Sequence, residues 1–185
     1  AQKKISGIIG PIHYGYAGTK HAAPITPPES LDINRMLCEM TEQKISQCFL
    51  EVSSHSLSLK RVHGMSFSVG IFTNLSRDHL DFHKTMDSYK EAKKGLFRDN
   101  FVEKAVTNID DPVGLEIANE FRGDLLTTSI DRIADVVAEN YKLSESGSSF
   151  TLKTPFGSCE IRTRLLGRHN IYNLLSAAAG AMVQN

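Results

Sequence analysis

The first clear pattern in the chain is a helical one between residues 25 and 45. Its apolar positions recur every three or four residues, and they are Ile33, Met36, Leu37 and Met40. This spacing predicts a helix with one buried stripe, and it leaves Glu39, Glu42 and Lys44 to solvent. In the opening ITPPES, we expect Thr26 to cap the helix, Pro27 to take its first position and Glu29 to reach back as in a capping box.

Short apolar runs then predict the strands of a sheet. They cover residues 48–52, 67–72 and 104–109, and each has the length of a buried strand. Helix-like stretches around 87–97 and 112–121 alternate with them. Because strands that alternate with helices build parallel sheets, we expect an α/β fold with a mostly parallel sheet flanked by helices.

The pattern changes near residue 133. Alternating segments separated by the turn-rich ESGSS and TPFG predict antiparallel hairpins, and therefore a small antiparallel subsheet near residues 133–166. ISGIIG near the start predicts a strand and a turn, and NIYNLLSAAAGAMVQN at the end predicts a helix without a closing cap. We expect residues 1–185 to form a single domain of a protein cut at both ends.

The amino-acid composition limits the classes of partner that the chain is expected to bind. The 21 basic and 21 acidic residues balance and form no long run, which argues against nucleic acid or an anionic membrane as a partner. The three cysteines form no CxxC pair, so neither a disulfide framework nor a structural zinc site is indicated. No apolar stretch approaches the ~20 residues of a membrane span. We expect a cytoplasmic protein with a small or locally charged substrate.

The segment FLEVSSHSL places Glu51 and Ser53 directly after a predicted strand. The carboxyl ends of parallel strands are where open α/β sheets bind ligands, so Glu51 could hold a metal there. The alternative is an acid in solvent at a strand end, followed by serines that begin a turn.

FTNLSRDHLDFH gathers His79, Asp81 and His83 after another predicted strand. On a helix the two histidines would share a face, which suits a soft metal, whereas Mg²⁺ would take one ligand together with carboxylates, waters and phosphates. The alternative is a polar turn whose histidines face water.

Lys93, in SYKEAKKGLF, lies on a predicted amphipathic helix, where a surface lysine is the ordinary interpretation. Burial would lower the pKa of its amine and allow reaction with carbon dioxide. The sequence contains no GxxxxGK[ST] phosphate-binding loop.

Six motifs in order, ITPPESLD, EVSSHSL, FTNLSRDHLDFH, YKEAKKGLF, TNIDDP and LLGRHNIYNLLSA, make the chain resemble the central, ATP-handling domain of the Mur ligase family. EVSSH followed by NLSRDHLD looks most like its members that add the third amino acid, diaminopimelate or lysine, to UDP-MurNAc-L-Ala-D-Glu in peptidoglycan synthesis. In that family the substrate carboxylate attacks the γ-phosphate of ATP, and an amine then displaces phosphate from the acyl phosphate. The resemblance implies that a C-terminal domain chooses the amino acid, and we expect this domain and the N-terminal UDP-binding domain to be absent from these 185 residues.

The resemblance also implies roles for single residues. Glu51 and His79 match positions that ligate Mg²⁺, and Lys93 matches the carbamylated lysine that serves as a further ligand. Thr26, Ser53 and Arg61 match positions that bind the UDP-muramoyl peptide. Asn170 and Asn173, in GRHNIYN, match positions near the nucleotide base.

Three residues depart from the family pattern: Pro27 replaces the usual threonine, Leu59 the usual glutamine and His169 the usual phenylalanine. Losing the hydroxyl and the amide removes hydrogen bonds worth about 0.5–1.5 kcal/mol each. Without the phosphate-binding loop, we expect little ATP binding and no catalysis by this chain alone. The alternatives are a non-catalytic module that binds UDP-sugar peptides, a ligase like folylpolyglutamate synthase, and a metal-dependent hydrolase built on His79, Asp81 and His83.

Overall fold

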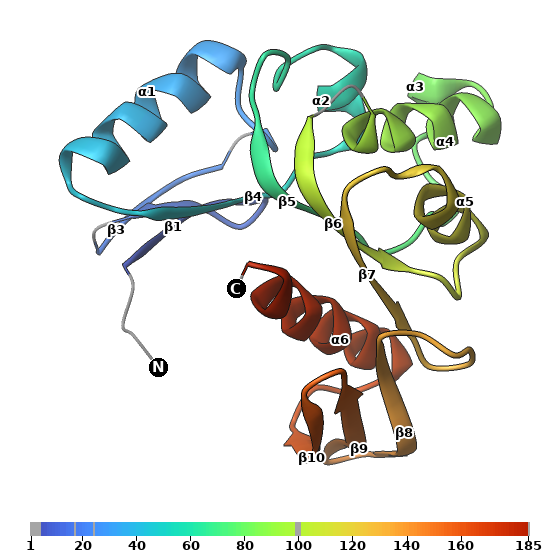
Figure 1. The fold of residues 1–185 in the computed structure, drawn as a ribbon. Helices are drawn as coiled ribbons and strands as arrows, with labels where there is room; N and C mark the ends of the chain where they lie inside the picture. Colours follow the sequence, from blue (N-terminus) through green and yellow to red (C-terminus); the bar gives the residue numbers. More distant parts are fainter. Residues whose placement is uncertain (1–4, 17, 24, 99–100, 185) are drawn as a thin grey trace. The chain divides into compact units, whose positions relative to one another are not determined.

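The computed structural model describes residues 5–16, 18–23, 25–98 and 101–184 of the 185-residue chain. The chain divides into two compact units. The first comprises Ala1–Met65 and Asp81–Lys93, and the second comprises Ser66–Leu80 and Lys94–Asn185. Figure 1 labels the elements of both units.

The first unit holds a four-stranded sheet in the order β3-β2-β1-β4. β1 and β4 are parallel, with Ser6 opposite Gln47, while β1, β2 and β3 form antiparallel pairs. The elements that lie wholly in this unit are β1 (Ser6–Ile9), β2 (Tyr14–Tyr16), β3 (Thr19–His21), α1 (Ser30–Glu42), β4 (Gln47–Leu50) and α2 (Ser54–Ser58). Most of α3 (Leu80–His83) and α4 (Met86–Lys94) also belongs to it.

Helix α1 begins later than its sequence predicts. Its N-cap is Glu29, which makes no side-chain capping bond, so the predicted roles of Thr26 as cap and Pro27 as first residue are wrong. The reason is local: Pro28 follows Pro27, and a residue before a proline is disfavoured in the helical conformation. The Thr26–Pro27 peptide bond is cis, and Pro27 is buried.

The predicted stripe of α1 is confirmed at Ile33 and Met40, which are buried, whereas Met36 and Leu37 are half-buried. Glu39 is not left to solvent as predicted. Its carboxylate accepts a hydrogen bond from the Tyr16 hydroxyl, and that bond together with burial raises the pKa of Tyr16 to about 12.

Strand β4 is present, but its predicted burial is wrong for Phe49, whose side chain is 56% exposed. Phe49 pairs with Ile8 of β1, which is also exposed. Neighbouring residues of a strand face opposite sides. Met40 of α1 covers the other side, because a Cβ added at Gly7 would lie 2.5 Å from its sulfur.

The second unit holds a six-stranded sheet in the order β10-β9-β8-β7-β6-β5. β5 to β8 are parallel and β8 to β10 antiparallel, so the strands predicted over 67–72 and 104–109 and the predicted antiparallel hairpins are confirmed and share one sheet. The strand predicted over 48–52 belongs to the four-stranded sheet of the first unit instead. The elements are β5 (Phe67–Phe72), η1 (Gly95–Phe97), β6 (Val102–Asn108), α5 (Pro112–Glu120), β7 (Asp124–Ser129), β8 (Val136–Ser144), β9 (Gly147–Thr154), β10 (Gly157–Thr163) and α6 (Arg168–Val183).

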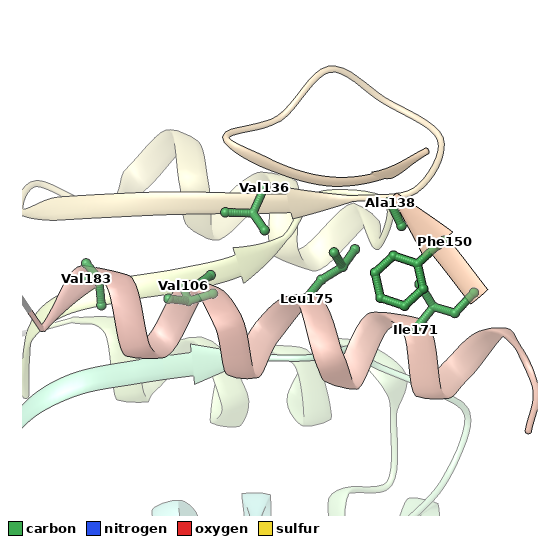
Figure 2. Packing of buried hydrophobic residues seen from close by; sticks show 8 residues of the cluster. Val106, Val136, Ala138, Phe150, Ile171, Leu175 and Val183 are labelled. Atoms are coloured by element: carbon green, nitrogen blue, oxygen red, sulfur yellow. The ribbon is translucent and has the colours of Figure 1, made fainter. Parts of the chain in front are cut away.

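The two longer helices of this unit cover opposite faces of its sheet. A Cβ at Gly180 of α6 would lie 2.8 Å from the Ile71 side chain, and a Cβ at Gly114 of α5 would lie 3.2 Å from the ring of Phe72. Because Ile71 and Phe72 are neighbours in β5, they point to opposite faces. Figure 2 shows the core under α6, where Leu175 points toward strand residues such as Val136.

Among the residues that the structure describes, no helix is long and apolar enough to cross a membrane.

Candidate functional site

Arg61 binds two residues of the segment that contains Thr26. Its guanidinium donates to the Pro27 carbonyl at 3.3 Å and to the Glu29 carboxylate at 2.8 Å, while its Nε is buried without a hydrogen-bond partner. The structure therefore brings two of the three predicted substrate-binding residues to one place in the first unit. A bound anion would accept hydrogen bonds from the same Arg61 guanidinium that binds Glu29. The Glu29 side chain is mostly exposed.

The third of these residues, Ser53, follows β4 together with Glu51. The Glu51 amide donates to the Ile9 carbonyl at 2.9 Å, which places Glu51 at the carboxyl ends of the parallel strands β1 and β4. Its side chain is exposed. The Ser53 hydroxyl accepts from the Ser56 amide at 3.2 Å and caps α2, so the predicted turn is present and its hydroxyl hydrogen remains available to a ligand.

His79 lies outside α3, so the condition under which the two histidines would share a helix face is not met. His79 precedes α3 in a left-handed conformation, with φ of 55°, and its ring lies 3.6 Å from the Asp78 carboxylate. Asp81 is exposed. His83 is buried, and its Nε2 is 2.9 Å from the Ser54 hydroxyl. The sequence reasoning missed this pair, because no local pattern relates residues 29 positions apart.

Lys93 is half-buried, and its ammonium lies 5.5 Å from the centre of the Tyr89 ring. The buried lysine is its neighbour Lys94, which sequence reasoning did not single out. Lys94 donates to Glu116 at 2.9 Å and Glu120 at 2.7 Å. Burial lowers the pKa of Lys94, but the two carboxylates outweigh it, so this pKa is raised above its ordinary value of 10.5.

Asn170 and Asn173 lie on the first turns of α6. The Asn170 amide donates to the Leu166 carbonyl at 2.7 Å, and the Asn173 amide donates to the Asn170 side-chain oxygen at 3.3 Å. His169 lies 3.1 Å from the Asn170 amide nitrogen. The two asparagines thus form a bonded pair at the start of α6.

A second feature absent from the sequence predictions is a buried carboxylate, Asp110, near that helix. It accepts from Ser129 at 2.6 Å, from the Ile130 amide at 2.7 Å and from the Tyr172 hydroxyl at 2.9 Å. Burial and the Asp110 bond together raise the pKa of Tyr172 to about 12. The signal in the sequence was TNIDDP, where Asp110 follows a buried strand.

Within the described parts of the chain, no three histidine, cysteine, aspartate or glutamate side chains gather as a ready metal site. Of the residues that the resemblance assigns to Mg²⁺, Glu51 and Lys93 lie in the first unit and His79 in the second.

Comparisons with known proteins agree with the motifs. A ligase named UDP-N-acetylmuramoyl-L-alanyl-D-glutamate–2,6-diaminopimelate ligase, from Bacillus cereus, is 38% identical over 185 residues, which cover 96% of this chain and 38% of the relative. The protein of the same name from Alkaliphilus metalliredigens is 40% identical over 176 residues, which cover 94% of this chain and 35% of that protein. The chain thus spans less than two fifths of the length of these relatives.

A solved structure of a ligase with that name superposes with a TM-score of 0.87 at 29% identity, over 99% of this chain and 38% of that one. MurF ligase from Thermotoga maritima in complex with ADP shares the fold, with a TM-score of 0.61 at 16% identity, over 75% of this chain and 33% of that one. The sequence profile of the Mur ligase middle domain matches residues 2–181. This chain therefore belongs to the Mur ligase middle domain family.

Proposed function

We propose that the chain is the central part of an ATP-dependent ligase that adds the third amino acid, diaminopimelate or lysine, to UDP-MurNAc-L-alanyl-D-glutamate. The observation that carries the proposal is the run of relatives at 38–40% identity over nearly the whole chain, which are named for the diaminopimelate reaction. EVSSH and NLSRDHLD lie within the matched region. The proposal includes the flanking parts that such relatives possess.

The proposed chemistry has two steps. The substrate carboxylate attacks the γ-phosphate of ATP to give an acyl phosphate and ADP, and the incoming amine then displaces phosphate to form the amide. Both steps crowd negative charge, and Mg²⁺ would relieve that crowding when bound. Glu51 would supply a carboxylate ligand, His79 an imidazole, and Lys93 an anionic oxygen once carbamylated.

The ligands proposed for Glu51, His79 and Lys93 are of the chemical types that a hard divalent ion accepts. Mg²⁺ takes oxygen ligands and keeps several waters, so one carboxylate, one carbamate and a single imidazole leave positions for water and phosphate. Glu51 is exposed to solvent and Lys93 is partly exposed, so both can be reached by an ion and by carbon dioxide.

Substrate binding is proposed for Thr26, Ser53 and Arg61, and base contacts for Asn170 and Asn173. The guanidinium of Arg61 is suited to a phosphate or carboxylate. The 185-residue sequence contains no GxxxxGK[ST] loop to cradle the ATP phosphates. We therefore propose that ATP is bound weakly by this chain alone.

The decisive test is a chimera in which this chain replaces the matching segment of the Bacillus cereus ligase. With ATP, the dipeptide precursor and diaminopimelate or lysine, it is expected to form the tripeptide precursor, detected by mass spectrometry. Glu51→Gln should abolish product, whereas Glu42→Gln on α1 should retain it. A folded chimera that binds precursor but makes no tripeptide would favour the non-catalytic binding module.

Substrate binding is tested on the chain itself by calorimetry with the UDP-muramoyl dipeptide. Thr26→Val removes one hydroxyl with little change of shape, and it should weaken binding by about two- to tenfold, as expected for one hydrogen bond. Thr41→Val, whose hydroxyl bonds the Leu37 carbonyl within α1, is the control. Equal affinity in both variants would contradict the assignment of Thr26.

A further inference from the structure

Four aromatic rings form a stack in the first unit, contributed by α2, α3 and α4. The stack consists of His55, Phe82, His83 and Tyr89. His83 lies at its centre: its ring is stacked on Tyr89 at 5.0 Å and 16° and meets Phe82 edge-on at 4.8 Å. His83 and Tyr89 are buried, with 7% and 4% exposure, whereas Phe82 at the edge of the stack is 36% exposed.

The two buried rings, His83 and Tyr89, each contact a residue in or beside the proposed site. At one end of this pair, the His83 imidazole is joined by a hydrogen bond of 2.9 Å to Ser54, which is the first residue of α2 and follows the capping Ser53. At the other end, the Lys93 ammonium lies over the Tyr89 ring, 5.5 Å from its centre. A cation at this distance from an aromatic face is attracted to it.

We propose that His83 and Tyr89 are positioning residues that fix the α4 lysine, Lys93, relative to the turn that carries Glu51 and Ser53. The proposal rests on the proposed function for the roles of those three residues. It adds that HxDxH contributes its second histidine as a structural link and not as a metal ligand.

The stack restricts the motion of the Lys93 side chain. Lysine has four rotatable side-chain bonds, and holding it in one place costs conformational entropy. The Tyr89 ring restricts Lys93, and the His83 stack in turn restricts Tyr89. Buried polar groups need partners, so the hydrogen bond between Ser54 and His83 also fixes the orientation of the imidazole. A site held in this way is preorganised before ligands arrive.

The test uses the 185-residue chain and separates the two contacts of His83. Ser54→Ala removes the hydrogen bond and keeps the stack, while His83→Gln keeps a polar group and removes the ring. Tyr89→Leu removes the platform under Lys93, and Tyr89→Phe retains it. Val62→Ala, at a buried residue of the same unit that is 1% exposed, is the control for general destabilisation.

The first readout is the nuclear Overhauser effect between the Lys93 side chain and the ring of residue 89, together with the ring-current shift of the Lys93 methylene protons. We expect both in the unmodified chain, in Tyr89→Phe and in Val62→Ala. Both should be lost in Tyr89→Leu and weakened in His83→Gln. A purely structural role would lower the melting temperature but leave these signals unchanged below the transition.

The second readout is the carbamate signal of Lys93 in ¹³C-labelled bicarbonate. Because the Tyr89 ring favours the Lys93 ammonium over the anionic carbamate, His83→Gln and Tyr89→Leu should raise this signal by about two- to fivefold, the size expected from losing one cation–π contact. If Lys93 forms no carbamate but the first readout changes as expected, the proposed role of Lys93 fails and the positioning stands. If folded His83→Gln leaves the Lys93 shifts and its contact with the Tyr89 ring unchanged, the positioning proposal is overturned.

Discussion

The Lys94 ammonium lies 2.7 Å from the Glu120 carboxylate, and the lysine side chain is only 4% exposed. Glu116, one turn earlier on α5, completes a fork around the same ammonium at 2.9 Å. Residues four apart share a helix face, so α5 presents both acids to one cation. Both carboxylates bind Lys94 within the second unit, across sequence separations of 22 and 26 residues.

Lys94→Met should lower the free energy of unfolding by about 1.5–3 kcal/mol, the range for hydrogen bonds to charged groups. Glu116 and Glu120 are half exposed and can turn to water, which keeps the loss below that of a fully buried pair. Urea unfolding measures the change. Lys153→Met is the control, because its pair with Glu139 is exposed and should contribute about 0–1 kcal/mol. Equal losses in the two variants would contradict the prediction.

Asp110 makes stability depend on pH in the acid range. Burial raises the pKa of this carboxyl, but hydrogen bonds from Ser129, Ile130, Tyr172 and Asp131 outweigh it, so the pKa lies below its ordinary value of 3.8. A depressed pKa stabilises the folded state above the unfolded value, and this contribution is lost as pH falls through the folded value.

The free energy of unfolding of the chain should therefore fall as pH drops below about 4. Asp110→Asn should flatten this dependence and lower stability at pH 7, as followed by urea titrations at several pH values. Asp124→Asn, at a side chain that is 77% exposed, should leave the slope unchanged. An unaltered acid slope in Asp110→Asn would count against this account.

Gly114 is required by the approach of α5 to β6. A Cβ at this position would lie 1.9 Å from the Asn108 carbonyl oxygen, a backbone atom that cannot turn aside. Gly114→Ala should destabilise the chain by about 1–3 kcal/mol or more, as overpacking does. Gly95→Ala is the control, since its Cβ meets nothing within 4 Å and the change should be neutral or stabilising by about 0.4–1 kcal/mol. Thermal unfolding that ranks the two variants in the opposite order would refute this.

Leu175 anchors α6 in the core of the second unit and is fully buried. Leu175→Ala removes a packed side chain and leaves a cavity, so it should cost about 2–5 kcal/mol in the free energy of unfolding. Leu31→Ala, on α1 and 70% exposed, should change stability by less than about 0.5 kcal/mol. Chemical denaturation of both variants provides the comparison.

Elements with strong periodicity were predictable, and element ends were less so. β5, β6, α5 and α6 lie where the apolar spacing places them. The predicted start of α1 was wrong because Pro28 disfavours the helical conformation at Pro27, and this restriction overrides the capping pattern. The exposure of Phe49 could not be foreseen, since an apolar run does not reveal which face of a strand another element covers.

In the candidate site, too, sequence motifs indicated some features and only the structure showed the others. Motif order singled out the segments that contain Glu51, Ser53 and Lys93, whose roles are proposals, and these segments lie within the residues that the family profile matches. No local pattern distinguishes Lys93 from Lys94, yet only Lys94 is enclosed and bonded by acids of α5. The bond between Ser54 and His83 likewise depends on two segments meeting in space.

The sequence by itself therefore determined the strongly periodic elements, the α/β class and the family, because hydrophobic spacing and motifs are written in neighbouring residues. Only the tertiary structure decided which lysine is buried, which histidine is joined to a serine, and which carboxylate gathers four donors. These outcomes depend on contacts between residues 20 to 60 positions apart, where the packing of whole helices and strands sets the partners.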